Sequence, residues 1–468
     1  MPWRAPTVRD RLRWLRVGPA LVVAAVLAGV ACQRTPPPAN VVVILIDDLG
    51  WMDAAAFGND ALATPAIDRL AAEGARFTSA YANAPNCAPA RASILAGQYP
   101  PRHGIHTVAT RVAPPAELRK LDPPETARDL PLAVVTIAEA LAPRGYRSAS
   151  IGKWHLGFGP AFAPGRQGFE VDVGSGGGVG QTASHVSPYR LRDLPEGPPG
   201  EYLGDRLTDE AIRFVAADDA RPFFLYLSHY AVHEPHQADA ATEARHLGDA
   251  ARERGQAYAA MVAATDRGIG RLLDALDRAG RAGDTAVFLL GDNGGNRLWS
   301  AMGDLRGTKG TLYEGGLRVP LVVRWPGVAV PGRVHDDPVM GADLYPTILD
   351  AAGVAAPPGH VLDGVSLVPV LRGAGLPERP LFWHFPHYLW SRRGEFRLTP
   401  ASAVRRGPYK LIELLEDGRI ELYDLARDPG ERDDLSAREP ATARALGAEL
   451  HAWRDAVGAP MPVPRRTP

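Results

Sequence analysis

Four short apolar runs along this chain end in polar residues. Residues 41–46 are apolar without alternation, which is typical of a strand covered on both faces, and they lead into Asp47 and Asp48. Three more runs of strand length lie at residues 146–151, 223–228 and 286–290. Because open α/β sheets bind ligands at the carboxyl ends of their strands, the polar residues after these runs predict one shared site.

Helical patterns separate these runs. Thr64 as a cap, Pro65 in the first turn and Gly74 as a stop predict one helix, and helix formers at residues 89–96 before Gly97 predict another. This alternation indicates an α/β fold with a large mixed, mostly parallel central sheet flanked by helices.

The pattern changes near the C-terminus. Residues 353–380 are rich in glycine and proline and predict a domain connection. Runs at 409–414 and 420–423 flank the turn sequence Glu416-Asp417-Gly418 and predict a hairpin, and a helix is expected at about 441–457. We therefore expect a main domain at residues 40–375 and a smaller C-terminal α+β subdomain with an antiparallel sheet at residues 376–468.

The N-terminal segment reads as an export signal. Arginines are scattered over residues 4–16 and precede an apolar run at 17–31 that is too short to span a bilayer comfortably. Cys32 follows and opens a proline-rich tether at 32–39, in a pattern that resembles a bacterial lipoprotein cleavage site. We expect a signal peptide at 1–31 and an exported protein that is periplasmic or anchored to the cell envelope by a lipid on Cys32, its only membrane contact.

Composition narrows the choice of partners. The 468 residues are 46% hydrophobic and carry a formal net charge of −1, which indicates a globular chain and gives no support for binding nucleic acid or an acidic membrane surface. Only four of the 52 basic residues are lysines: Lys120, Lys153, Lys309 and Lys410. Where arginine is this dominant, a retained lysine indicates a need for a compact ammonium group.

Cys87 is the only cysteine apart from Cys32, so the mature exported protein cannot place it in an intramolecular disulfide. Two interpretations are open: a buried structural cysteine, or a reactive one. The second is favoured by its place near a helix N-terminus, where free amides stabilise an anion, and by Arg91 one turn later on the same face.

Oxygen ligands stand at two of the strand ends. Asp47, Asp48, Asp292 and Asn293 offer hard donors, which select calcium or magnesium over zinc. Capping of neighbouring helices is the alternative for either pair alone. His233 and His236 could suggest a zinc pair, but the intervening Pro235 opposes a helical ligand arrangement.

The string Cys87 to Gly104, CAPARASILAGQYPPRHG, closely resembles the signature of the type I sulfatases. Further blocks that resemble this family follow in the same order, so that the resemblance covers about residues 40–435. They lie at residues 151–157 (IGKWHLG), 222–235, 305–320 (LRGTKGTLYEGGLRVP), 343–347, 363–367 and 422–431.

The resemblance implies a sulfuric ester hydrolase that cleaves aryl or carbohydrate sulfate monoesters. It implies that Cys87 is oxidised to formylglycine (3-oxoalanine) by a formylglycine-generating or sulfatase-maturating enzyme, and that the hydrated aldehyde is the nucleophile. By the same resemblance His233, assisted by Lys309, protonates the leaving oxygen, and His155 takes the proton that lets sulfate depart. The catalytic set is Cys87, Arg91, Lys153, His155, His233 and Lys309, and one Ca²⁺ (or Mg²⁺) is held by Asp47, Asp48, Asp292, Asn293 and the side chain derived from Cys87.

Three other functions stay open. A phosphonate monoester hydrolase or phosphodiesterase would use the same nucleophile on phosphorus esters. A two-zinc phosphatase is opposed by Asn293, which stands where a histidine is expected, and a non-catalytic protein that binds sulfated glycans is opposed by the full catalytic set. We expect the loops at 156–200 and 385–403 to determine substrate specificity, but their composition does not identify a particular sugar or aryl group.

Overall fold

The computed structural model of the protein describes residues 39–108, 114–239, 241–242, 253–391 and 394–465. The chain from Ala39 onward folds as one unit. The predicted signal peptide at 1–31 and the tether with Cys32 lie outside the described residues, apart from Ala39. No helix in the described part of the chain has the length and apolar character needed to cross a membrane.

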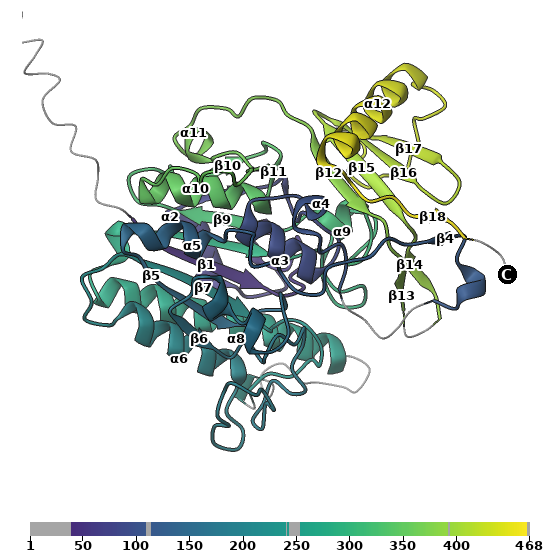
Figure 1. Cartoon of the computed structure of the whole chain (residues 1–468). Helices are drawn as coiled ribbons and strands as arrows, with labels where there is room; N and C mark the ends of the chain where they lie inside the picture. The colour runs from purple at the N-terminus through teal and green to yellow at the C-terminus, as the bar shows by residue number, and fades with distance from the viewer. Residues whose placement is uncertain (1–38, 109–113, 240, 243–252, 392–393, 466–468) are drawn as a thin grey trace, which may run out of the picture. The chain divides into compact units, whose positions relative to one another are not determined.

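The centre of the fold is an eight-stranded sheet with the order β10-β2-β9-β8-β1-β7-β5-β6 (Figure 1). Its strands are β1 (Asn40–Ile46), β2 (Ala75–Phe77), β5 (Arg147–Gly152), β6 (Val171–Val173), β7 (Phe223–His229), β8 (Thr285–Gly291), β9 (Leu321–Arg324) and β10 (Arg333–His335). All neighbours from β8 to β6 are parallel, whereas β9 is antiparallel to both β8 and β2. The predicted mixed, mostly parallel sheet is confirmed.

Helices cover both faces of this sheet. Val42 and Ile44 of β1 pack in a core with α2 (Pro65–Glu73), α6 (Leu203–Val215) and α8 (Glu253–Arg278). Val41 and Val43 face the opposite core, which contains residues of α3 (Cys87–Ala96), α5 (Ile137–Leu141) and α10 (Leu344–Ala352). This double cover, with α3, α5 and α10 in front and α6 and α8 below in Figure 1, explains why β1 is apolar without alternation.

The C-terminal part contains a four-stranded antiparallel sheet with the order β12-β15-β16-β17. Its strands are β12 (Leu381–Phe385), β15 (Ala401–Arg406), β16 (Tyr409–Leu414) and β17 (Arg419–Asp424), and α12 (Pro440–Val457) packs on it. The predicted hairpin is confirmed, because β16 and β17 pair from Tyr409–Asp424 to Leu414–Arg419. Trp383 and Leu450 share their core with Tyr81 and Leu312 of the preceding part, so the two parts pack directly.

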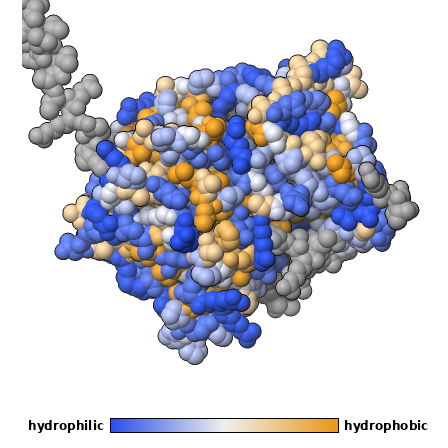
Figure 2. All heavy atoms as spheres, viewed as in Figure 1, coloured by the Kyte–Doolittle hydropathy of each residue, from blue (hydrophilic) through white to orange (hydrophobic). Residues whose placement is uncertain are grey.

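Short elements complete the fold. They are β3 (Ala80–Tyr81) with β11 (Val339–Met340), β4 (Leu121–Asp122) with β18 (Val463–Pro464), β13 (Leu389–Trp390) with β14 (Phe396–Leu398), and the helices α4 (Pro100–His103), α9 (Glu314–Leu317) and α11 (Val368–Leu371). Hydrophilic residues with apolar ones between them cover the face seen in Figure 2, as is usual for a globular protein in water.

The predicted helix with Thr64 as N-cap, Pro65 in its first turn and Gly74 at its end is confirmed as α2, but its capping hydrogen bonds come from another residue. The Thr64 side chain makes no capping hydrogen bond to α2, and its hydroxyl accepts one from the Ala55 amide at 2.9 Å instead. The first amides of α2, on Ala66 and Ile67, donate to the Asp266 carboxylate of α8 at 3.0 and 2.8 Å. Asp266, about 200 positions away along the chain, therefore accepts the hydrogen bonds from the helix N-terminus that the local sequence led us to expect at Thr64.

Candidate active site

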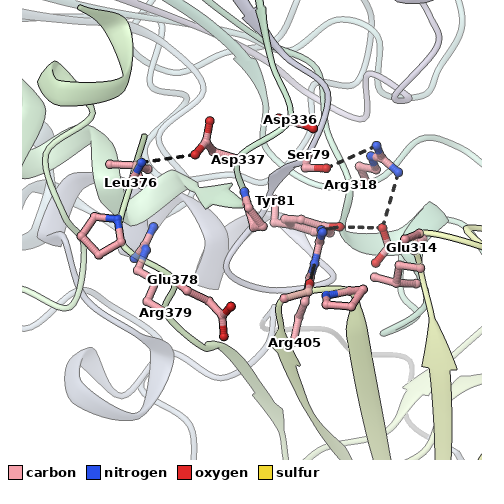
Figure 3. Close-up of a pocket in the computed structure, with 16 residues that line it drawn as sticks. Ser79, Tyr81, Glu314, Arg318, Asp336, Asp337, Leu376, Glu378, Arg379 and Arg405 are labelled. Carbon is pink, nitrogen blue, oxygen red and sulfur yellow. Dashed lines mark hydrogen bonds and ion pairs between the residues drawn. The ribbon is translucent and has the colours of Figure 1, made fainter. Parts of the chain in front are cut away.

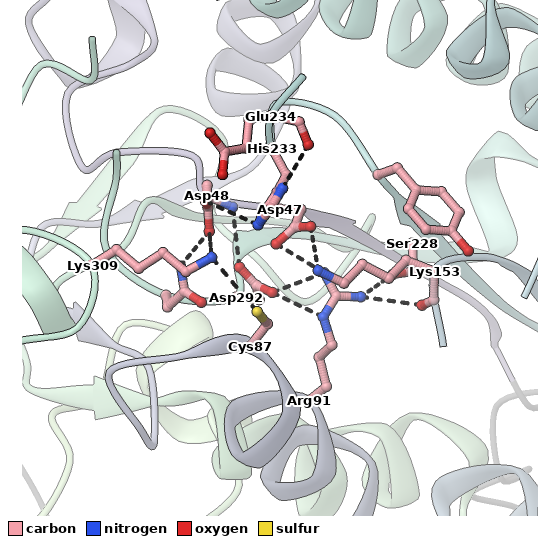
Figure 4. Close-up of polar contacts among 12 residues, drawn as sticks. Asp47, Asp48, Cys87, Arg91, Lys153, Ser228, His233, Glu234, Asp292 and Lys309 are labelled. Atoms are coloured by element: carbon pink, nitrogen blue, oxygen red, sulfur yellow. Dashed lines mark hydrogen bonds and ion pairs between the residues drawn. The ribbon is translucent and has the colours of Figure 1, made fainter. Parts of the chain in front are cut away.

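Four neighbouring parallel strands, β8, β1, β7 and β5, deliver the predicted site residues to one edge of the central sheet. Asp47 and Asp48 follow β1, Asp292 and Asn293 follow β8, and Lys153 and His155 follow β5. The loop after β7 supplies His233. Figure 4 shows the labelled members of this set around the first turn of α3.

Cys87 is the first residue of α3, with Asn86 as the N-cap, and Gly97 ends the helix in the left-handed conformation. The cysteine is free and buried, and its Sγ lies 3.6 Å from Lys309 Nζ. Burial raises the pKa of the Cys87 thiol, although the charges of Lys153 and Lys309 work in the opposite direction. A cysteine packed among charged groups in this way is unlike an ordinary apolar core cysteine.

Arg91 is fully buried and points from α3 into the strand ends (Figure 4). Its Nε and Nη2 lie 2.9 and 2.8 Å from Asp292 Oδ2, and Nη1 donates to the Lys153 carbonyl at 3.1 Å. It also donates to the hydroxyl of Ser228 at the end of β7. The sequence reasoning gave Ser228 no role, and its only signal was a polar residue at the end of an otherwise apolar strand.

The site balances three buried carboxylates with three cations. Lys153 contacts Asp47, Lys309 Nζ lies 2.6 Å from Asp48 Oδ1, and Arg91 pairs with Asp292. Burying a charge is costly unless an opposite charge compensates it, so these pairings allow the cluster to exist in the core.

The surroundings shift the pKa values of Asp48 and Asp292 in opposite directions. Burial opposes ionisation of Asp48, but the charges of Lys309 and His233, together with the hydrogen bonds from Lys309 and Asn293, hold the Asp48 pKa below its usual range. Burial together with the neighbouring charge of Asp47 raises the pKa of Asp292 to about 6. Burial works against the ammonium form of Lys309, yet Asp48 and Cys87 raise its pKa above the usual value.

The donor set fits a hard divalent cation. Ligand atoms of Asp47, Cys87 and Asp292 lie within 4.8 Å of one another, and no other such group of His, Cys, Asp or Glu side chains occurs in the described residues. Asp47 Oδ1 and Asn293 Oδ1 are buried without a hydrogen-bond partner, and the Asn293 amide donates to Asp48 at 2.8 Å. Unsatisfied buried oxygens at this point are what an oxygen-ligated Ca²⁺ or Mg²⁺ requires.

His155 is held in a left-handed conformation with φ of 60°. A Cβ at Gly180 would lie 2.4 Å from its Nε2, so the glycine-rich loop packs directly on the ring. Burial and the charge of Lys153 lower the pKa of His155 well below its usual value, which leaves the imidazole neutral. The glycine-rich part of the loop predicted at 156–200 has no signal in the sequence for the side chain that it covers.

His233 and Lys309 both lie beside the Asp48 carboxylate. Its Nδ1 is 2.9 Å from the Glu234 carbonyl, which can only accept, so the remaining nitrogen Nε2 faces Asp48 Oδ2 at 3.8 Å. Burial and Lys309 lower its pKa to about 4. His185, for which the sequence predicts no role, lies with Nε2 3.0 Å from the His233 carbonyl, whereas His236 packs edge-on against Tyr258. Among the described residues, no group of three or more metal-ligating side chains includes His233 or His236.

Comparison with known proteins gives consistent matches. The family model described as "Sulfatase" matches residues 39–354, and "N-sulphoglucosamine sulphohydrolase, C-terminal" matches residues 308–454. The steryl-sulfatase of Mus musculus is 33% identical over 91% of this chain and 84% of its own length. The N-acetylgalactosamine-6-sulfatase of Canis lupus familiaris is 32% identical over 87% and 84%. The structure of Ps i-CgsB in complex with k-i-k-neocarrahexaose superposes with a TM-score of 0.74 at 27% identity over 89% of this chain and 92% of that one.

Proposed function

The chain belongs to the sulfatase family, whose members hydrolyse sulfate monoesters, and from this premise we propose that its nucleophile derives from Cys87 and that its cofactor is a divalent cation. The observation that carries the proposal is the buried, charge-balanced cluster around Cys87. Asp47, Asp48, Asp292, Asn293 and the side chain at position 87 would hold the cation, with Ca²⁺ as our first choice and Mg²⁺ as the alternative.

Charge favours an ester with one negative charge, such as a sulfate monoester, over a phosphate monoester. When present, formylglycine at position 87 supplies an aldehyde hydrate as nucleophile and the cation supplies two positive charges. The protein groups of the cluster sum to zero, so the loaded site has a surplus of two positive charges. A sulfate monoester with one negative charge and one ionised nucleophile neutralise that surplus, whereas a phosphate monoester dianion exceeds it.

We propose that Arg91, Lys153 and Lys309 hold the site in shape and stabilise the negative charge that develops on the sulfuryl oxygens. His233 protonates the leaving oxygen through Nε2, the nitrogen on the side of Asp48. Its pKa of about 4 reflects burial and the Lys309 charge, and an anionic ester beside Lys309 raises it towards the range of a proton donor. His155, neutral in its pocket, accepts the proton when sulfate leaves.

Two measurements test this function. Mass spectrometry of the peptide around position 87 should find the aldehyde or its hydrate, and an unmodified cysteine in fully active enzyme would contradict the nucleophile assignment. Cys87→Ala should abolish turnover of an aryl sulfate. Turnover of aryl phosphates or phosphonates in preference to the sulfate would replace this proposal with a phosphorus-ester hydrolase of the same fold.

The substrate itself is proposed as an aryl or carbohydrate sulfate. The relatives include a steryl-sulfatase and an N-acetylgalactosamine-6-sulfatase, and one structural relative is bound to k-i-k-neocarrahexaose. A screen of sulfated glycans, steroids and aryl sulfates selects among these classes. A formylglycine-generating or sulfatase-maturating enzyme is the proposed partner before catalysis.

We also propose that the catalytic domain spans residues 40–375, that residues 376–468 form the C-terminal subdomain, and that the protein is exported to the periplasm or envelope. The arginines and apolar run of residues 4–31 support export, and Cys32 supports a lipid anchor. Labelling with palmitate and processing that globomycin blocks are the expected results. Absence of both contradicts the anchor.

A further inference from the structure

Lys410 is one of the four lysines of the chain, and it is fully buried far along the sequence from the groups proposed to act on substrate. It lies on β16 of the C-terminal sheet, where its Nζ is 2.9 Å from Glu314 Oε1 and 2.9 Å from Glu431 Oε1. Neither the family resemblance nor the proposed mechanism assigns it a role. The ammonium is a compact point charge with three donors, and here it contacts two carboxylates at once.

Glu314 is the hub of this cluster. Its Oε2 accepts a hydrogen bond from Tyr81 at 2.7 Å, and its main-chain amide donates to Glu431 Oε2 at 2.7 Å. Glu314 is among the residues that line a pocket of about 470 Å³. Figure 3 shows Tyr81 and Arg318 directed towards its carboxylate. Glu314 therefore has contacts in the main domain, through Tyr81, and in the C-terminal sheet, where the Lys410 ammonium contacts its carboxylate directly.

Glu314 also ends the loop that carries Lys309. The Gly315 amide donates to the Arg306 carbonyl at 2.7 Å, and the Lys309 amide donates to the Gly295 carbonyl at 3.0 Å, two residues after Asn293. The backbone segments touch: a Cβ on Gly315 would lie 2.2 Å from the Gly307 carbonyl. Because these backbone segments are in close contact, we expect a shift of Glu314 to move the loop at residues 306–315 and with it Lys309.

We propose that Lys410 is a positioning residue for Lys309: the C-terminal sheet sets the place of the Lys309 ammonium through the Lys410–Glu314–Glu431 cluster. The inference rests on the proposed role of Lys309 in turnover. In this arrangement the C-terminal subdomain contributes to catalysis without touching the substrate. A displacement of about 1 Å at a charged catalytic group costs up to about 100-fold in rate.

A double-mutant cycle tests the proposal, with 4-nitrophenyl sulfate as substrate and Lys120→Met at an exposed lysine as the control. Lys309→Met should lower kcat by about 100-fold or more. Lys410→Met should lower kcat by about 10- to 100-fold with KM changed less than about threefold, but should cost less than about threefold in the Lys309→Met background.

The outcomes separate the two claims. An unchanged kcat in Lys309→Met overturns the proposed role of Lys309 itself. A reduced kcat in Lys309→Met together with an unchanged kcat in Lys410→Met overturns only the positioning role, as does an equal loss from Lys410→Met in both backgrounds.

Should Lys410→Met fail to fold, Lys410→Met with Glu431→Gln keeps the net charge of the cluster at −1 and should show the same selective loss of kcat. A double variant with the kcat of the unmodified protein contradicts the positioning role.

Discussion

Replacing Arg91 by Met tests whether the site is assembled by charge balance. The substitution keeps most of the buried volume but removes the guanidinium that contacts Asp292 at 2.8 Å and lies 3.6 Å from Asp47. Ligand oxygens of these two carboxylates lie within 4.8 Å of each other. At an effective dielectric constant of about 20, two unit charges at this separation repel by about 3.5 kcal/mol.

The expected loss in the free energy of unfolding is therefore about 3–5 kcal/mol in a chelating buffer at pH 7, the range for breaking a buried ion pair. The pH dependence has a definite sign. Because the pKa of Asp292 is about 6 even with Arg91 in place, its carboxyl is protonated at pH 5 in both proteins, and the difference between them should shrink there. Calcium should reduce the difference in unfolding free energy between the two proteins at pH 7, since a bound cation compensates the charge of the same carboxylates.

Urea denaturation of both proteins at pH 5 and pH 7, with chelator or with calcium, measures the free energy of unfolding and its dependence on pH and calcium. Arg427→Met is the control, because Arg427 is 89% exposed and should change stability by less than about 0.5 kcal/mol. A loss below about 1 kcal/mol for Arg91→Met in chelator, or an equal effect of calcium on both proteins, would refute the claim that Arg91 compensates buried charge.

Three further predictions follow from other parts of the structure. Chelation should abolish activity and calcium or magnesium should restore it better than zinc, since the fitted ligands are oxygens; undiminished activity after thorough chelation contradicts the site. Burial and, to a smaller extent, His106 lower the pKa of His103 to about 3, so the unfolded chain gains a proton at this residue as pH falls below 6.5, and His103 by itself should cost about 2 kcal/mol of stability from pH 7 to 5; His103→Gln should remove this share of the pH dependence seen by thermal denaturation at each pH, whereas other buried histidines such as His233 keep the rest. Gly180→Ala should lower kcat by about tenfold or more, because its Cβ would displace the His155 ring, whereas Gly165→Ala, with no atom within 4 Å of the added carbon, should leave kcat unchanged.

Much of the site could be predicted from local sequence. The apolar run of β1 followed by two aspartates identified a strand buried on both faces and an oxygen-rich strand end. The glycine and proline positions placed α3 within two residues of its start, and Gly97 ended it as expected. These features depend on neighbours within a few residues, which is why a single sequence reveals them.

Other features required the tertiary structure. The sequence placed polar residues after four strands, but their convergence depends on the order β8-β1-β7-β5, which the crossover connections decide. Arg91 was expected on the face of Cys87, whereas its partner is Asp292, 201 residues away. Lys410 was conspicuous only as a rare lysine until the fold placed two glutamates 2.9 Å from its ammonium.

The helices and strands, the oxygen-rich strand ends and the family resemblance can thus be inferred from the amino-acid sequence, because periodicity, turn chemistry and motif spacing are local properties. Which charges meet depends on the tertiary structure. A buried charge is stable only beside its counter-charge, and in this protein the counter-charges come from strands, helices and a C-terminal sheet that are distant along the chain.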